Sequence, residues 1–238
     1  MIPLPTIAMV LAAGIGLRMR PLAHDRPKAM IAIGGRTLID RALDRLVDAG
    51  IETAVVNVHY KAELLRRHLA ARVRPRIVVS DETDALLDTG GGIAKALPLL
   101  GGGPFFAVNS DMIWFNGARD LFERMAERFD PAVMDALLLV HPTPSAVGYD
   151  GPGDFTMAPD GQIERRVEAR VAPFVFTGIQ LLHPRLFDAA PAGAFSLNRL
   201  YDRALGAGRL FGLRHDGLWI EVGTPGNALM AERVVATL

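Results

Sequence analysis

The sequence of 238 residues contains no cysteine, which excludes disulfide bonds, thiolate metal sites and a cysteine nucleophile. It also has no excess of one charge, since 26 Lys and Arg residues balance 26 Asp and Glu residues. A general attraction to nucleic acid or to a membrane surface is therefore not expected, and any positive site must be local. The six histidines are scattered singly, so a zinc cluster is not expected either.

Long apolar runs are also missing. The first apolar segment is too short to cross a bilayer, and it is not built like a signal peptide. We therefore expect a cytoplasmic protein that makes no membrane contact, either a monomer or a small homo-oligomer. Half of the residues are hydrophobic, and a chain of this length fits a single domain.

Strand and helix patterns alternate along the first half of the chain. Because such alternation implies right-handed crossovers, we expect an α/β fold with a mostly parallel, mixed sheet flanked by helices. Ligands of such sheets bind at the carboxyl ends of the strands. The expected strands are 6–12, 53–58, 76–80, 105–108, 135–140, 155–157, 163–166, 174–182 and 210–213, and the expected helices are 38–49, 62–71, 93–100, 118–129, 197–207 and 225–238.

The first expected strand leads directly into Gly14 and Gly16, where backbone amides can converge on a phosphate. Arg18 adds a planar cation that can hold two phosphate oxygens, and Lys28, which we expect to be exposed, adds a point charge. The spacing fits neither the Walker loop nor the dinucleotide fingerprint, whose third glycine would stand where Met19 is.

Other candidates follow later strands. Asp111 comes after a central strand, where a carboxylate can hold Mg²⁺ or cap a turn. The glycines at 90–92 precede an expected helix, as a hinge or as a backbone approach to a planar base. Thr177 and Gly178 interrupt an apolar strand, which indicates a close approach to a ligand or to a neighbouring strand. Trp114 and Phe115 are expected in a loop packed on the site.

The stretch from Leu11 to Leu22, with Pro27 and Lys28, resembles the signature of the sugar-phosphate nucleotidylyltransferases. Within that family the chain is most similar to the N-acetylmuramate 1-phosphate uridylyltransferases of bacterial peptidoglycan recycling. Matching motifs are Asp88-Thr-Gly-Gly-Gly-Ile, Asn109-Ser-Asp111, Gly153-Asp-Phe, Thr177-Gly-Ile, Ala192-Gly-Ala-Phe and Trp219-Ile-Glu-Val-Gly-Thr.

The resemblance implies a Rossmann-like nucleotidyltransferase fold of the GT-A-like type, spanning residues 1–238. Residues 1–140 would bind UTP, and 141–238 would form a small lobe for the sugar 1-phosphate. It implies catalytic roles for Arg18 and Lys28 and an Mg²⁺ site at Asp111 and Glu221. The nucleotide-binding residues would be Leu11, Ala12, Ala13, Gly14, Gly16, Asp88, Gly90, Gly91 and Asn109, and those for the acceptor Asp154, Thr177, Gly178 and Glu221.

Three questions stay open at this level. The acceptor could be another sugar 1-phosphate (mannose, glucose or heptose 1-phosphate), or phosphocholine with CTP if Trp114, Trp219 and Tyr149 form an aromatic cage. The chain could also be a nucleotide sensor without catalysis. Finally, the arginines at 165, 166 and 170 could bind the acceptor or blunt a strand edge.

Overall fold

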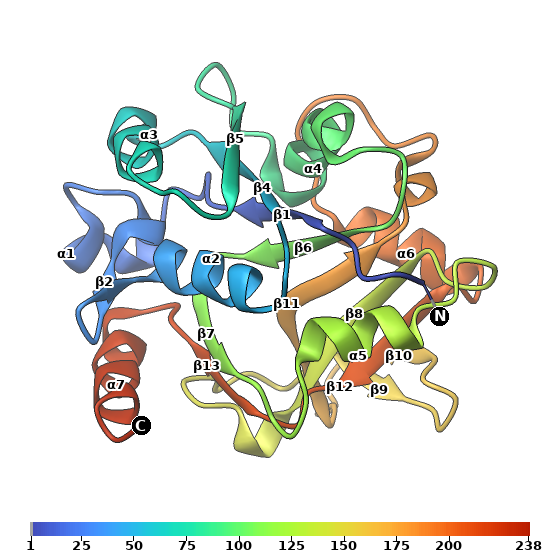
Figure 1. The fold of residues 1–238 in the computed structure, drawn as a ribbon. Helices are drawn as coiled ribbons and strands as arrows, with labels where there is room; N and C mark the ends of the chain where they lie inside the picture. The colour runs from blue at the N-terminus through green and yellow to red at the C-terminus, as the bar shows by residue number, and fades with distance from the viewer. Residues whose placement is uncertain (1) are drawn as a thin grey trace.

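The computed structural model describes residues 2–238, and its centre is a nine-stranded sheet (Figure 1). Its strands are β1 (Ile7–Leu11), β4 (Thr53–Val58), β5 (Arg76–Asp81), β6 (Phe105–Asn109), β8 (Ala136–Pro142), β9 (Phe155–Met157), β10 (Ile163–Arg165), β11 (Phe174–Leu182) and β12 (Leu210–Arg214). The main order is β10-β9-β11-β6-β1-β4-β5, while β8 pairs with β11 and β12. Strands β6, β1, β4 and β5 are parallel, whereas β11 runs antiparallel to β6.

Two small sheets accompany the large one. They pair β2 (Ala32–Ile33) with β3 (Arg36–Thr37), and β7 (Met112–Phe115) with β13 (Leu218–Glu221). The helices are α1 (Arg20–Ala23), α2 (Leu38–Asp48), α3 (Ala62–Ala70), α4 (Asp88–Leu100), α5 (Leu121–Arg128), α6 (Asn198–Gly206) and α7 (Pro225–Val235), with short 3-10 turns at Leu17–Met19, Lys28–Met30, Thr143–Ser145 and Pro184–Phe187.

Successive side chains of β1 point to opposite faces of the sheet, and each face carries its own core. Ala8 and Val10 belong to a buried cluster formed with α2, α3 and α5. Met9 belongs to a second cluster, formed with α4 and α6 on the other face. The sheet is therefore covered by helices on both sides, which explains why β1 is apolar on both of its faces.

Helix α2 illustrates how the sequence sets the elements. The Thr37 hydroxyl accepts a hydrogen bond from the Asp40 amide at 3.2 Å and caps the first turn. Ile39, Leu43 and Leu46 then recur at helical spacing, and all three side chains are fully buried.

The predicted α/β architecture is confirmed, and the expected strands and helices match to within a few residues at their ends. Two expectations were wrong. Trp114 and Phe115 lie in strand β7 instead of a loop, because β7 pairs with β13, more than a hundred residues away. Gly90, Gly91 and Gly92 lie inside α4, which begins at Asp88, instead of preceding the helix. No helix within residues 2–238 combines the length and apolar character needed to span a bilayer.

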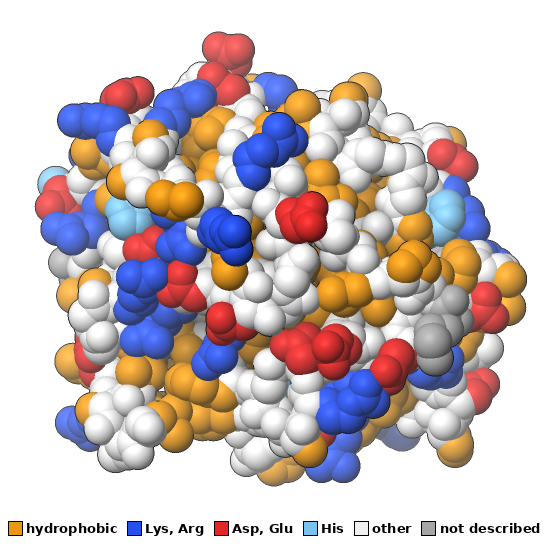
Figure 2. All heavy atoms as spheres, in the orientation of Figure 1, with side chains coloured by type: hydrophobic (Ala, Val, Ile, Leu, Met, Phe, Trp, Pro, Cys, Tyr) orange, Lys and Arg blue, Asp and Glu red, His pale blue; other side chains and the backbone are white. Residues whose placement is uncertain are grey.

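The surface shows mixed charge. Figure 2 shows Lys and Arg side chains interspersed with Asp and Glu side chains over the face in view, as the formal net charge of zero leads one to expect.

Candidate active site

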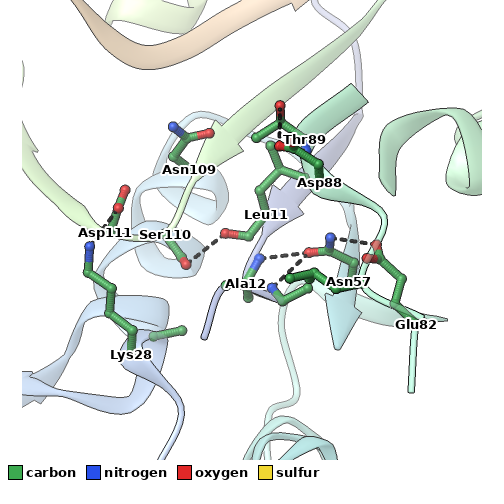
Figure 3. Close-up of a pocket in the computed structure, with 14 residues that line it drawn as sticks. Leu11, Ala12, Lys28, Asn57, Glu82, Asp88, Thr89, Asn109, Ser110 and Asp111 are labelled. Carbon is green, nitrogen blue, oxygen red and sulfur yellow. Dashed lines mark hydrogen bonds and ion pairs between the residues drawn. The ribbon is translucent and has the colours of Figure 1, made fainter. Parts of the chain in front are cut away.

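A cavity of about 370 Å³ opens at the carboxyl ends of β1, β4 and β6 (Figure 3). It lies at the edge of the sheet that the parallel strands predict for a ligand. Its lining combines predicted and unpredicted residues: Leu11, Ala12, Ala13, Gly14, Lys28, Ala29, Asn57, Glu82, Leu86, Asp88, Thr89, Asn109, Ser110 and Asp111.

A second hollow, of about 490 Å³, adjoins the first and shares Gly14, Lys28 and Asp111 with it. Gly16 and Arg18 line this hollow. Gly16 has φ of +66°, and a Cβ there would lie only 2.9 Å from the Cβ of Lys28, so glycine permits the loop to fold against the lysine. The structure thus brings together the predicted phosphate loop and both predicted catalytic cations.

Lys28 and Asp111 point toward each other in Figure 3, and their Nζ and Oδ2 atoms are 2.8 Å apart. The Lys28 side chain is only 12% exposed, so the expectation of an exposed lysine was wrong. Asp111 directly precedes β7, and the pairing of β7 with β13 sets the position of this carboxylate. The Asp111 side chain keeps 39% exposure and remains accessible from the cavity.

Glu221, the last residue of β13, is opposite Met112 in the β7–β13 ladder. Burial raises the pKa of the Glu221 carboxyl, and the Asp111 carboxylate raises it further, while Arg18 and Lys28 oppose the shift. Two carboxylates and two cations therefore share one electrostatic site. No group of three or more acidic or histidine side chains within residues 2–238 forms a metal cluster.

Two carboxylates nevertheless suit Mg²⁺ chemically. This ion takes hard oxygen ligands and commonly uses one or two carboxylates together with water and substrate phosphates. The pKa of Glu221 is raised first by burial and then by the Asp111 carboxylate, and a divalent cation would offset the second effect. Asp111 and Glu221 are thus suited to share such an ion with a phosphate ligand.

Asp88 stands at the opposite wall of the cavity. Its backbone has φ of +59°, which is uncommon for a residue other than glycine, and such strain concentrates at functional sites. Its Oδ1 accepts a hydrogen bond from the Thr89 amide at 2.6 Å.

Gly90 and Gly91 were expected to bind the nucleotide, but neither residue lines the cavity. Both amides donate to the Phe195 carbonyl, at 2.9 and 3.1 Å, so they are not free for a nucleobase. A Cβ on Gly90 would come within 2.3 Å of the Phe195 ring. These glycines therefore allow α4 to pack against the segment before α6, a role that their spacing in the sequence does not reveal.

Asn57 and Glu82 form a buried hydrogen-bonded pair that the sequence did not single out as part of the site. Asn57 Oδ1 accepts from the amides of Ala12 and Ala13, and its Nδ2 donates to Glu82 Oε1 (Figure 3). The amides of Ala12 and Ala13 are therefore engaged within the protein, and both residues line the cavity, so their assignment to nucleotide binding stays a prediction. The signal for Asn57 was its place at the end of β4, and the signal for Glu82 was its place in the polar, acidic stretch 81–89 just after β5.

The predicted acceptor residues are only partly brought together. Asp154 contributes to the raised pKa of Glu221, and its Oδ2 accepts from the Phe176 amide at 2.8 Å. Thr177 is fully buried and its hydroxyl donates to the Leu139 carbonyl, so a direct contact between its side chain and the acceptor is excluded. Gly178 sits in a bulge of β11, where a Cβ would lie 2.9 Å from Asn109 Nδ2. Its close approach is to a neighbouring strand.

Two of the three arginines are engaged within the protein, and the aromatic cage does not form at the tryptophans. Arg165 pairs with Asp202 at 2.7 Å, and Arg166 donates to carbonyls of its own loop. Trp114 and Trp219 are each only 2% exposed, and Trp219 Nε1 donates to the backbone carbonyl of Thr177. A cage for a quaternary amine is therefore excluded at these tryptophans. A third cavity of about 240 Å³ shares Leu11, Asp88, Thr89 and Asn109 with the first and continues toward α6.

Comparison with known proteins agrees with this geometry. Residues 8–210 match the family model of the MobA-like NTP transferase domain. The chain is 46% identical, over 98% of both chains, to the N-acetylmuramate alpha-1-phosphate uridylyltransferase of Caulobacter vibrioides. It is 34% identical to the Neisseria meningitidis protein of the same name, over 91% of this chain and 93% of that one.

A solved structure of an apo UDP-glucose pyrophosphorylase superimposes with a TM-score of 0.80, covering 100% of this chain and 99% of that one at 14% identity. At that identity the match establishes the fold, which is that of a nucleotidyltransferase. By the family model, these relatives and the cavity described above, the chain belongs to the MobA-like NTP transferase family and is a nucleotidyltransferase.

Proposed function

We propose that the protein transfers a uridylyl group from UTP to N-acetylmuramate α-1-phosphate and releases pyrophosphate. The observation that carries the proposal is the convergence of Lys28, Asp111 and Glu221 beside a glycine loop, in a chain 46% identical throughout to an enzyme of that name. The expected cytoplasmic location and role in peptidoglycan recycling stay predictions.

In the proposed reaction an oxygen of the sugar phosphate attacks the α-phosphorus of UTP in line. The new O–P bond forms as the bond to the bridging oxygen breaks, and pyrophosphate leaves with the electron pair. No general base is needed, since the attacking phosphate is already ionised at neutral pH. The protein therefore acts by positioning and charge neutralisation.

Each charged residue then has a distinct task. Lys28 would neutralise the α-phosphate as charge develops, and Arg18 would hold the β- and γ-phosphates from its exposed position beside the second hollow. Asp111 and Glu221 would hold Mg²⁺, which supplies charge neutralisation of the triphosphate. In this scheme residues 1–140 bind the nucleotide, and residues 141–238 contribute Glu221 and the acceptor side.

The test is a matrix of nucleotides and acceptors with pyrophosphate release as the readout. Purified protein with Mg²⁺ is offered UTP, CTP, GTP or dTTP, each with N-acetylmuramate, glucose or mannose 1-phosphate or with phosphocholine. The proposal expects UTP with N-acetylmuramate 1-phosphate to give the highest kcat/KM. A clear preference for another pair would replace the substrate, and nucleotide binding without release for any pair would favour a sensor.

A further inference from the structure

A chain of hydrogen bonds joins the two walls of the nucleotide cavity through the protein interior. It starts at the amide of Ala12, which lies 2.7 Å from Asn57 Oδ1, and continues from Asn57 Nδ2 to Glu82 Oε1, also 2.7 Å. It ends at Glu82 Oε2, which accepts from the Leu87 amide at 3.2 Å. The phosphate loop and the segment that carries Asp88 are thus connected by two side chains from β4 and the end of β5.

This chain of hydrogen bonds, called the relay below, is almost completely buried, although both side chains lie at the wall of the cavity. Asn57 is 3% exposed and Glu82 is 0% exposed, and no Lys or Arg within residues 2–238 forms an ion pair with Glu82. A Cβ on Gly92 would lie 2.7 Å from Glu82 Oε1 and 3.0 Å from Asn57 Nδ2, so the space around the pair is filled. A lost bond here leaves a buried polar group without a partner, which is costly.

The relay also continues the hydrogen bonding of the backbone beyond the point where the β1–β4 ladder ends. The β1–β4 ladder pairs Val10 with Val56, and beyond it the amides of Ala12 and Ala13 have the Asn57 side chain as their partner. On the other side, Leu87 lies past the end of β5 and outside any ladder. Asn57 and Glu82 therefore link the two walls through side chains where the strand ladder no longer does.

We propose that Asn57 and Glu82 are positioning residues that fix the separation of the two walls for the nucleoside triphosphate. Both side chains line the cavity, and they act on its walls through the backbone at Ala12 and Leu87. The proposal rests on the proposed function, because it takes the cavity between the walls to be the UTP site.

The polarity of the relay allows a sharp test with Asn57→Asp, Glu82→Gln and the double variant. In Asn57→Asp, a carboxylate faces the Glu82 carboxylate with no donor between them while both are ionised, so the variants are compared at alkaline pH, where the relay breaks. In the double variant the new carboxamide at position 82 can donate to the new carboxylate at position 57 and accept from Leu87. Every bond of the relay is then restored with one direction reversed.

Two readouts are measured for each variant: KM and kcat for UTP, and the hydrogen exchange rates of the Ala12 and Ala13 amides by NMR. We expect Asn57→Asp to raise KM for UTP by about tenfold or more, with a smaller change in kcat and faster exchange at both amides. We expect the double variant to recover most of both losses. Asp40→Asn, which alters a buried carboxylate on α2 outside the cavity, is the control for a general loss of stability.

A double variant no better than Asn57→Asp would overturn the proposal, and so would recovery of slow exchange without recovery of KM. So would an equal rise of KM in the Asp40→Asn control. If the wild-type protein releases no pyrophosphate with any acceptor, the proposed function fails. The exchange rates together with UTP affinity by calorimetry then decide the relay on their own.

Discussion

Replacing Lys28 by Met should remove catalysis while leaving the fold almost intact. The structure separates these two effects because the partner of Lys28 is half-open to water. At 2.8 Å, two unit charges in an effective dielectric constant of about 20 attract by about 6 kcal/mol before any solvation cost. Asp111 is 39% exposed, and pairs open to water retain about 1 kcal/mol or less of net stability.

The effect of the substitution on kcat should be larger than its effect on the free energy of unfolding. A fixed positive charge aimed at developing negative charge in a sheltered site typically contributes a factor of about 100 to 1,000 in kcat. The Lys28 side chain, 12% exposed, is sheltered in this sense. We therefore expect Lys28→Met to lower kcat by that factor and the free energy of unfolding by about 1 kcal/mol at most.

The assay pairs pyrophosphate release from UTP and N-acetylmuramate 1-phosphate with urea unfolding. Lys95→Met, which removes a lysine that lies outside the cavity on α4, is the matched control and should turn over normally. Lys28 also lowers the pKa of Glu221, so its removal should move the acid limb of the kcat/KM profile to higher pH in the residual activity. Normal turnover by Lys28→Met, or an unmoved acid limb, would refute the reasoning.

Three further predictions concern single side chains. Because burial and Asp111 raise the pKa of Glu221, activity should fall with decreasing pH at a pH above the pKa of an ordinary glutamate. Glu221→Gln should abolish this acid limb of the pH–activity profile and raise the Mg²⁺ concentration needed for half-maximal rate. Burial lowers the pKa of His215 from 6.5 to about 4, so as the pH falls below 6.5 the unfolded chain takes up a proton before the folded protein does. The free energy of unfolding therefore decreases, by about 2 kcal/mol at pH 5. In urea unfolding, His215→Phe should reduce the difference in this free energy between pH 7 and pH 5 by the same amount. Asp40→Asn breaks the 2.7 Å pair with Arg72 and should lower the free energy of unfolding by about 3 kcal/mol with kcat unchanged.

The elements of the fold could be predicted because their signals are local. Alternating apolar faces, a Thr37 cap and the glycine after α2 all act within a few residues, and so do the strand patterns. The β7–β13 pair could not be predicted this way, since the short apolar run Met112–Phe115 does not indicate which distant segment it pairs with. Yet this pair brings Glu221 to Asp111. The proposed metal ligands Asp111 and Glu221 were assigned through resemblance, because the two residues come near each other only in the tertiary structure.

The same distinction explains which site residues were misassigned. The roles of several glycines stayed open, as hinges or as close approaches to a ligand or a strand, because the sequence shows that a side chain is missing without showing what occupies the space. At Gly16 the space admits Lys28, and at Gly92 it admits the pair of Asn57 and Glu82. Gly90 makes room for Phe195.

The hydrogen-bond donors of the phosphate loop are therefore held in place by side chains for which the glycines leave room. An alanine at position 92 should disturb nucleotide binding through the relay, although no atom of Gly92 lines the cavity. An alanine at position 103, where a Cβ would meet nothing within 4 Å, provides the comparison. If Gly92→Ala and Gly103→Ala bind UTP equally well, the tight space at position 92 has no bearing on the nucleotide, and the glycines of this site need another explanation.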